Sequence, residues 1–259
     1  MKKSKFNWLE LPVKKIKNSL EEMVEIDQEI LEVLKNDHRL SVQRIAYQIE
    51  EKHAMKQRYI QHYQSLNHYE NKAGEAGYRL IAGIDEAGRG PLAGPVVAAA
   101  VILREDEMIL GLDDSKKISP KRRLELFKEI NLKARSVGVG VVDERRIDAV
   151  NILEATREAM VKAVKNLRPQ PDLLLIDALE LEVDIDQFAI IKGDSLSNSI
   201  AAASIVAKVT RDHLMEAYHF RYPQYGFMSH KGYGTHQHYE ALRQYGPTAI
   251  HRRTFIKNL

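Results

Sequence analysis

Short apolar runs recur along the chain from Leu80 onward, each bounded by glycine, proline or polar residues. Runs of this length and composition are typical of buried strands. They predict five strands, at Leu80–Asp85, Val96–Leu103, Ser136–Val142, Asp172–Asp177 and Phe188–Ile191. Apolar residues at helical spacing predict helices between and after these strands, at Pro120–Leu132, Arg145–Leu167 and about Ser195–Tyr218.

The order of these elements predicts an α/β protein with a five-stranded mixed sheet flanked by helices. Only turns or a short helix separate the first three strands, which favours an antiparallel meander. Long helices precede the fourth strand and follow the fifth. Strands joined in this way are expected to lie parallel to their neighbours, with right-handed crossovers.

The first seventy residues have a helical pattern without strands. Pro12–Met23, Ile26–Lys35 and Ser41–Tyr63 are predicted to be amphipathic helices, and the polar, glycine-containing stretch 71–77 has the composition of a linker. We therefore predict a small helical accessory domain at residues 1–71 and an α/β domain with a C-terminal helical region at residues 72–259. The basic, aromatic end of the third helix could contact nucleic acid and assist substrate binding, or could be a solvated face.

Composition narrows the function classes only slightly. The chain has 259 residues, 44% of them hydrophobic and 29% charged, with a net charge of +3. It has no cysteine, which excludes disulfides, a thiolate zinc site and a thiol nucleophile. No apolar run is long enough for a signal peptide or a membrane span, so we expect a cytoplasmic protein without membrane contact.

Carboxylates follow three of the predicted strands. Asp85 and Glu86 close the first strand, Asp177 closes the fourth, and Asp194 comes shortly after the fifth. The carboxyl ends of parallel strands meet at one edge of a sheet, where sites form in α/β proteins. Clustered carboxylates repel one another without counter-charge, and hard oxygen ligands suit Mg²⁺ or Mn²⁺. Two such ions can promote the in-line displacement of a phosphodiester. We also expect the backbone to begin turning at Asp85–Glu86, because adjacent residues of a regular strand face opposite ways.

A glycine-punctuated segment comes directly after the first two acids. Gly88 and Gly90 permit close backbone approach, and Arg89 between them offers a fork suited to phosphate. This segment lacks the third glycine and the helix of a dinucleotide-binding fingerprint. The sequence also contains no phosphate-binding loop of the Gly-x-x-x-x-Gly-Lys-Ser/Thr type.

The stretch His219–Leu259 combines basic and aromatic residues, which is compatible with nucleic-acid binding or with a packed aromatic subdomain. Ser204, Lys208 and Arg211 share one face of a predicted helix, which could follow a phosphate backbone or be solvated. His230, His236 and His238 are spaced too loosely to suggest a metal site, and we expect them on the polar surface.

The chain closely resembles type 2 ribonuclease H, ribonuclease HII, over a region from Tyr78 to the C-terminus. Seven segments occur in the family's order: Gly83–Pro95, Asp113–Lys117, Leu175–Asp177, Lys192–Asp194, Ala201–Lys208, Lys231–Thr235 and His251–Phe255. One departure is Thr254, where the family more often has serine. The sister family, ribonuclease HIII, shares the fold but lacks the Gly-Arg-Gly pattern.

The resemblance implies a ribonuclease H-like fold and assigns Asp85, Glu86, Asp177 and Asp194 as the catalytic, metal-binding set. It implies that Gly88, Arg89 and Gly90, together with Tyr233, read the 2′-hydroxyl at a ribonucleotide-to-deoxyribonucleotide junction. A bare glycine backbone can bond this hydroxyl, which distinguishes RNA from DNA. Further phosphate contacts are implied at Lys116, Lys117, Ser204 and Lys208.

The implied activity is an endoribonuclease that uses Mn²⁺ or Mg²⁺, with two ions during catalysis. It would cut the RNA strand of RNA–DNA hybrids and incise 5′ of single ribonucleotides in duplex DNA, leaving 3′-hydroxyl and 5′-phosphate ends. The alternatives are another metal-dependent nuclease of this fold and a non-catalytic nucleic-acid-binding module. We expect a monomer without an obligate protein partner and, because the sequence ends soon after Phe255, without a tail that docks a replication clamp.

Overall fold

The computed structural model describes residues 8–23 and 26–257 and divides into two compact units, Met1–Gln61 and His62–Leu259. The first unit consists of η1 (Trp8–Glu10), α1 (Val13–Glu21), α2 (Gln28–Lys35) and the larger part of α3 (Leu40–Leu66). Its helices bury the apolar stripes that the sequence pattern predicted. Its core is formed by Trp8, Ile16, Leu20, Leu31, Leu34, Val42 and Ala46.

The second unit begins within α3 and continues with α4 (His68–Glu75), where the sequence suggested a linker. The expectation of a linker is wrong for residues 71–75. Ala73 is buried against Leu173, Leu175, Ile190 and Ile200, so one face of this short polar helix is anchored in the fold.

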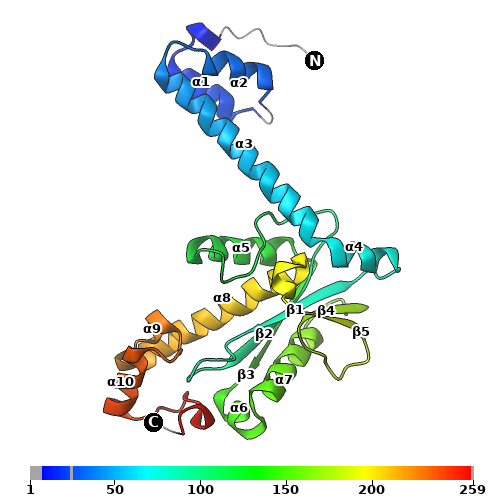
Figure 1. Ribbon diagram of the computed structural model, residues 1–259, viewed down its shortest axis with the longest axis vertical. Helices are drawn as coiled ribbons and strands as arrows, with labels where there is room; N and C mark the ends of the chain where they lie inside the picture. The colour runs from blue at the N-terminus through cyan, green and yellow to red at the C-terminus, as the bar shows by residue number, and fades with distance from the viewer. Residues whose placement is uncertain (1–7, 24–25, 258–259) are drawn as a thin grey trace. The chain divides into compact units, whose positions relative to one another are not determined.

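The five predicted strands form one mixed sheet with the order β3-β2-β1-β4-β5 (Figure 1). Its strands are β1 (Ile81–Ala87), β2 (Val96–Ile102), β3 (Ser136–Val142), β4 (Leu173–Asp177) and β5 (Asp186–Ile190). The β1–β2 and β2–β3 pairs are antiparallel, and the β1–β4 and β4–β5 pairs are parallel. The structure therefore confirms the meander followed by parallel strands.

Helices cover both faces of the sheet (Figure 1). They are α5 (Pro120–Lys133), α6 (Glu144–Val150), α7 (Ile152–Lys165) and α8 (Asn198–Arg221). One core lies between the sheet and α7, and a second lies between β2, α5 and α8. At Gly83 of β1, a Cβ atom would lie 2.0 Å from the carbonyl carbon of Ser199, so this glycine lets α8 lie directly on the strand.

The single helix predicted at Arg145–Leu167 is in fact two helices. Asn151 lies between α6 and α7 with a φ of 74°, a left-handed conformation that asparagine tolerates. Its side-chain oxygen accepts hydrogen bonds from the amides of Leu153 and Glu154, which caps α7. A local cap thus overrides the continuous apolar periodicity.

The C-terminal region is helical, as predicted. It contains η3 (Pro223–Tyr225), α9 (Phe227–His230), α10 (His236–Tyr245) and η4 (Arg253–Phe255). Tyr225 and Phe227 are buried with Leu92 and Ala93, so this region packs against the segment after β1. Within the described residues, no helix has the length and apolar character needed to cross a membrane.

Candidate active site

The parallel pairing of β1 and β4 brings the predicted acids to one edge of the sheet. Ile84 lies opposite Ile176, and Asp85 and Asp177 directly follow this pair. Asp194 belongs to η2 (Gly193–Ser195), the turn that comes after β5. The amide of Gly193 donates a hydrogen bond of 2.8 Å to Asp177 Oδ1, which ties the turn of Asp194 to the end of β4.

We expected the backbone to begin turning at Asp85 and Glu86, and this expectation is wrong. Both residues still pair with β2, opposite Ala99 and Ala98, and β1 ends only at Ala87. The first residue with a left-handed conformation after β1 is Gly88, with a φ of 95°. The pairing of β1 with β4 ends at Ile84 and Ile176, whereas the pairing of β1 with β2 continues through both acids to Ala87.

Burial and mutual repulsion raise the pKa values of these acids. The Asp85 side chain is buried, and its pKa lies well above the usual value because of this burial and the charges of Glu86 and Asp177. Burial also raises the pKa of Glu86, and Arg89 opposes this shift. The pKa of Asp194 is raised by burial, by Asp114 and by Asp177. The acids are therefore close enough to repel one another.

Two lysines lie beside the acids. Burial alone would lower the pKa of Lys116, but Asp114, Asp194, Asp85 and Asp177 together raise it. Lys117 Nζ donates hydrogen bonds of 3.1 Å to Asp113 Oδ1 and to Ser195 Oγ. The role of these lysines as phosphate contacts stays a prediction, and the structure places both at the carboxylate edge.

Asp114 is a site residue that our sequence reasoning did not select, although it lies in one of the matched segments. Its charge raises the pKa of Asp194, and its Oδ1 atom accepts a hydrogen bond from the Lys116 amide. The signal available in the sequence was the pair Asp113-Asp114 immediately before two lysines.

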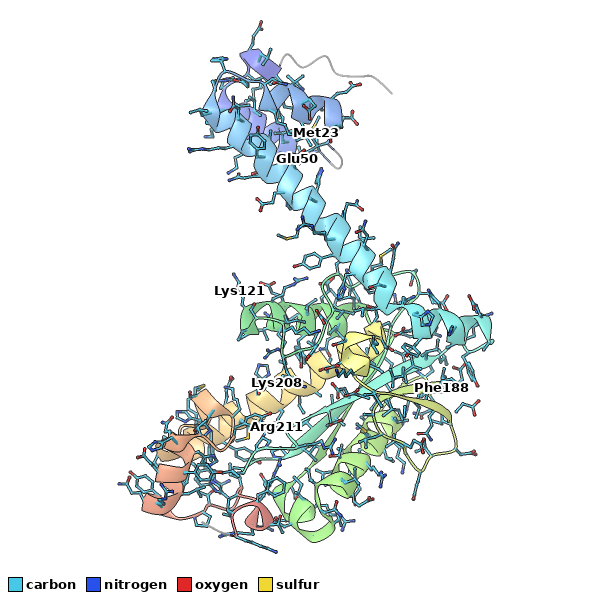
Figure 2. The ribbon with its side chains drawn as sticks, viewed as in Figure 1. Met23, Glu50, Lys121, Phe188, Lys208 and Arg211 are labelled. Atoms are coloured by element: carbon cyan, nitrogen blue, oxygen red, sulfur yellow. The ribbon has the colours of Figure 1, made fainter. Side chains whose placement is uncertain are left out.

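The predicted basic face of α8 does not follow the surface. Ser204 is buried and donates to Ser115 Oγ at 2.9 Å. Lys208 pairs with Asp212 at 2.7 Å. Arg211 is only 1% exposed, so neither the phosphate-tracking nor the solvated alternative holds for this residue (Figure 2).

Gly88, Arg89 and Gly90 begin the loop that joins β1 to β2, residues 88–95, and this part of the loop lies beside Tyr233. A Cβ atom on Gly88 would lie 2.0 Å from Arg211 Nε, so this position requires glycine for space as well as for its left-handed backbone. A Cβ atom on Gly90 would point toward the Tyr233 ring, 3.9 Å from Cε1. Arg89 reaches back to Glu86 Oε1 at 3.2 Å. Tyr233 is 44% exposed, so its ring is accessible beside Gly90.

Two buried arginines hold this loop, and sequence reasoning missed the role of both. Arg252 donates to the carbonyl oxygens of Arg89 at 2.8 Å and of Gly88 at 2.5 Å, and Gly94 O accepts two further bonds. Arg211 donates to Pro95 O and Ala93 O, both at 3.0 Å. No carboxylate bonds either side chain among the hydrogen bonds described. The charges are stabilised by main-chain carbonyl dipoles of the loop itself.

Two of the three histidines expected on the surface are buried, so that expectation is wrong for His230 and His238. His238 stacks on His230 and hydrogen-bonds His251 Nε2 at 3.0 Å. Because His251 Nδ1 accepts from the Thr248 amide, its Nε2 carries the proton and donates to His238. His238 Nδ1 then donates to Tyr233 O at 2.9 Å. This chain of neutral rings supports the backbone of the tyrosine, whereas His236 is exposed.

The carboxylate edge has the chemistry of a divalent-cation site without a complete set of ligands. Among residues 8–23 and 26–257, no three His, Asp or Glu side chains already converge in a metal-binding geometry. Glu86 Oε2 is nonetheless buried without a hydrogen-bond partner. An unpartnered buried carboxylate oxygen beside repelling acids fits hard cations such as Mg²⁺ or Mn²⁺. Asp85, Glu86, Asp177 and Asp194 are the residues that would hold them.

The sheet order and its acidic edge define a ribonuclease H-like protein, and comparison with known proteins agrees. A ribonuclease H2 structure from Pyrococcus horikoshii aligns with a TM-score of 0.58 and 30% identity, over 69% of this chain and 94% of that chain. The Bst ribonuclease HIII in complex with Mn²⁺ aligns at 0.50 with 21% identity, over 67% of this chain and 65% of that chain. The second likeness shows the fold alone.

The family models for ribonuclease HII and for the ribonuclease HII N-terminal domain match residues 82–258 and 12–74. A ribonuclease HII from Acetivibrio thermocellus is 51% identical over 96% of this chain and 98% of its own length. The chain belongs to the ribonuclease HII family. It is therefore a hydrolase of the ribonuclease H type.

Proposed function

We propose that this chain hydrolyses the RNA strand of RNA–DNA hybrids and also incises duplex DNA 5′ of a single embedded ribonucleotide. The products would carry 3′-hydroxyl and 5′-phosphate ends, and the cut would begin the removal of ribonucleotides from DNA. One observation carries the proposal: the end of β1 joins the acids Asp85 and Glu86 directly to the loop that faces Tyr233.

The loop is suited to recognise a ribose hydroxyl. Its glycines carry no side chains that would cover the backbone, and Arg252 binds the carbonyl oxygens of Gly88 and Arg89 and so fixes this backbone before a substrate arrives. Preorganised polar groups lose little entropy when they bind, which favours discrimination between a 2′-hydroxyl and a hydrogen atom. Tyr233 would stack on the following sugar, where an additional hydroxyl would be crowded.

The carboxylates are suited to hold divalent cations, and Lys116 compensates part of their charge. When bound, Mg²⁺ or Mn²⁺ would supply Lewis-acid stabilisation of the charge that develops on the phosphodiester oxygens, with two ions acting together. Asp85 and Asp177 would position the cations at the edge of the sheet, and the η2 turn would add Asp194.

The test compares three end-labelled duplexes: all-DNA, DNA with one ribonucleotide, and a full RNA–DNA hybrid. Each is incubated with Mg²⁺, with Mn²⁺ and with EDTA. We expect metal-dependent cleavage of the second and third duplexes, and no cleavage of the first. Cleavage of all-DNA duplex would favour a different nuclease of this fold, and binding without turnover would favour a non-catalytic module.

Asp85→Asn provides the matched control in the same assay. It keeps the size of the side chain and an oxygen acceptor but removes one charge, so cleavage should fall on the order of 10³-fold or more while hybrid binding persists. Turnover close to wild type in this variant would contradict the assignment of the acids.

A further inference from the structure

We infer that Glu70 of α4 is a positioning residue for Asp194, acting through the first turn of α8. The inference rests on the proposed function because it takes Asp194 to be one of the working carboxylates. It assigns a part in the active site to a stretch of chain that precedes the sheet and that contributes no group to the carboxylate edge.

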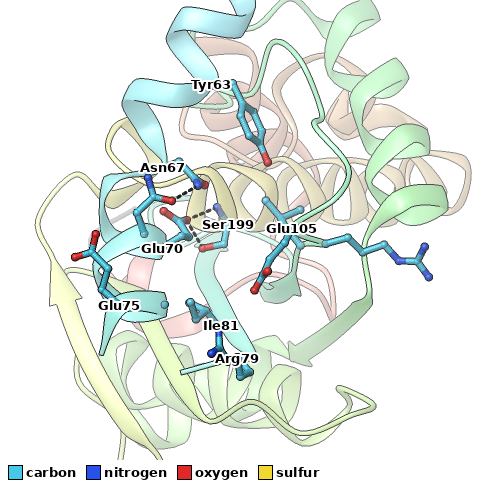
Figure 3. A pocket seen from close by; sticks show the side chains of 12 residues that line it. Tyr63, Asn67, Glu70, Glu75, Arg79, Ile81, Glu105 and Ser199 are labelled. Carbon is cyan, nitrogen blue, oxygen red and sulfur yellow. Dashed lines mark hydrogen bonds between the residues drawn. The ribbon is translucent and has the colours of Figure 1, made fainter. Parts of the chain in front are cut away.

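A single carboxylate oxygen of Glu70 binds the start of α8 three times. Oε1 accepts hydrogen bonds from the Ser199 amide at 2.9 Å and from Ser199 Oγ at 2.7 Å (Figure 3). It also accepts one from Ser197 Oγ at 2.6 Å. An anion at a helix N-terminus is favoured by the exposed amides and by the helix dipole. Glu70 therefore supplies from another helix the charge that α8 lacks in its own first turn.

A second anchor acts on the residue between these serines. Asn198 Nδ2 donates to Tyr63 O at 2.8 Å and to Asn67 Oδ1 at 3.2 Å. Ser197, Asn198 and Ser199 are essentially inaccessible to solvent. Buried polar groups lose stability when a partner is removed, because water cannot replace it. The helix start is thus fixed at three consecutive positions by residues of α3 and α4.

The turn that carries Asp194 is closed on this anchored point. The amides of Leu196 and Ser197 both donate to Gly193 O at 2.9 Å. Gly193 in turn donates its own amide to Asp177 Oδ1. A shift of Ser197 would therefore move Gly193, and with it the position of Asp194 relative to Asp177. Glu70 acts on the site through this path rather than by contact with a substrate.

Glu70 borders a cavity of about 460 Å³ whose other lining residues include Tyr63, Asn67, Glu75 and Arg79 (Figure 3). Shortening a side chain that faces a cavity removes its hydrogen bonds but little close packing. A variant at this position therefore reports mainly on the anchor of α8. Glu75, which is exposed and lines the same cavity, gives a matched control on the same helix.

The experiment uses the full chain and measures kcat, KM and the Mg²⁺ concentration for half-maximal rate on the duplex with one ribonucleotide. Glu70→Ala should lower kcat about 10- to 100-fold and raise the half-saturating Mg²⁺ concentration, as loss of an outer-shell partner does, with little change in KM. Glu70→Gln, which keeps an oxygen acceptor, should recover most of kcat, and Glu75→Ala should match wild type.

A readout without turnover completes the test. The rise in melting temperature on adding Mn²⁺ should be smaller for Glu70→Ala than for wild type or Glu75→Ala. Wild-type kinetics in Glu70→Ala, or a change confined to KM, would overturn the inference. If Glu70→Ala does not fold, Ser199→Ala takes its place and should show a smaller decrease in kcat and a smaller rise in the half-saturating Mg²⁺ concentration. Wild-type values in Ser199→Ala would then overturn the inference. Failure of the wild type to cut would instead refute the proposed function, so the two failures are distinguishable.

Discussion

The acidic edge and the loop that follows it are adjacent in sequence but are stabilised in opposite ways. In the loop, five carbonyl groups, those of Gly88, Arg89, Ala93, Gly94 and Pro95, accept hydrogen bonds from Arg252 and Arg211. At the edge, carboxylates face one another, and the buried Glu86 Oε2 has no partner. In the free protein the buried arginine charges of the loop are compensated by hydrogen-bonded carbonyl groups, whereas the carboxylate charges of the edge are not fully compensated.

The pKa values show the same contrast. Burial lowers the pKa of Arg252 to about 9, so even this guanidinium remains charged at neutral pH, and burial also lowers the pKa of Arg211. Burial and repulsion raise the pKa values of Asp85, Glu86 and Asp194. The loop tolerates its buried charges because carbonyl dipoles surround them. The compensating cations near the acids are Arg89, Lys116 and Lys117.

This difference suits the two tasks that the proposed function requires. A surface that must distinguish a hydroxyl from a hydrogen atom benefits from rigid groups that need not reorganise. A site that must take up cations needs excess negative charge beforehand, and it bears the cost of that repulsion until they bind. Changes to the two regions should therefore affect stability with opposite signs.

The largest expected effect follows removal of a loop-holding arginine. Arg252→Met would leave several buried carbonyl groups without donors and should lower the free energy of unfolding by about 3–5 kcal/mol. Urea denaturation followed by circular dichroism measures this change. Arg253→Met is the matched control, because its exposed side chain is predicted to matter by less than about 0.5 kcal/mol. Equal stability of the two variants would show that the loop does not depend on Arg252.

The second prediction concerns cation binding at the edge. At a free Mn²⁺ concentration of about 100 times the dissociation constant, the folded protein should gain about 2.7 kcal/mol of stability. EDTA should reverse this gain, and Asp177→Asn should diminish it. Asp148→Asn is the control, because Asp148 binds the amides of Arg253 and Thr254 rather than the edge. Stabilisation that persists unchanged in Asp177→Asn would place the cation elsewhere.

The third prediction tests the neutral histidines that support Tyr233. The pKa of His251 falls from 6.5 to about 4 in the folded protein, mainly through burial. Between these values the unfolded chain binds more protons, so stability must decrease as pH falls. Protonation of His251 in the unfolded chain should lower the free energy of unfolding by about 2 kcal/mol at pH 5.

Urea denaturation at pH 7 and pH 5 measures this loss. It should be smaller in His251→Gln, whereas His236→Gln, on the exposed face of α10, should retain the wild-type pH dependence. The same dependence in all three proteins would mean that His251 is charged in the folded state.

Much of this architecture could be predicted from the sequence because its signals are local. Apolar runs gave the five strands, and the parallel β1–β4 pairing then grouped Asp85 with Asp177. Helical spacing correctly put Ser204 and Arg211 on one face of α8. Helical spacing cannot predict which segment covers this face of α8, because the loop after β1 that covers it at Arg211 is remote in the chain.

The same reason explains the buried arginines and histidines. In the sequence, Arg252 lies next to another arginine and resembles a solvated residue. Its burial depends on carbonyl groups far earlier in the chain, such as that of Gly94, which is 158 positions away. One signal could have suggested the arrangement. A loop rich in glycine presents many carbonyl groups and few side chains, so its acceptors need donors from elsewhere.

The smallest predicted effect is also the one that separates the two regions most directly. In the absence of metal, Asp85→Asn removes one of the repelling charges while an amide oxygen can still accept from the Glu86 amide. The free energy of unfolding should therefore rise, by about 1 kcal/mol. Urea denaturation in EDTA measures this gain, and Asp212→Asn is the control, because it removes a charge that is paired with Lys208. In saturating Mn²⁺ the order should invert, with the wild type more stable than Asp85→Asn. A loss of stability in EDTA would mean that Asp85 is already compensated in the free protein, and the edge would then resemble the loop.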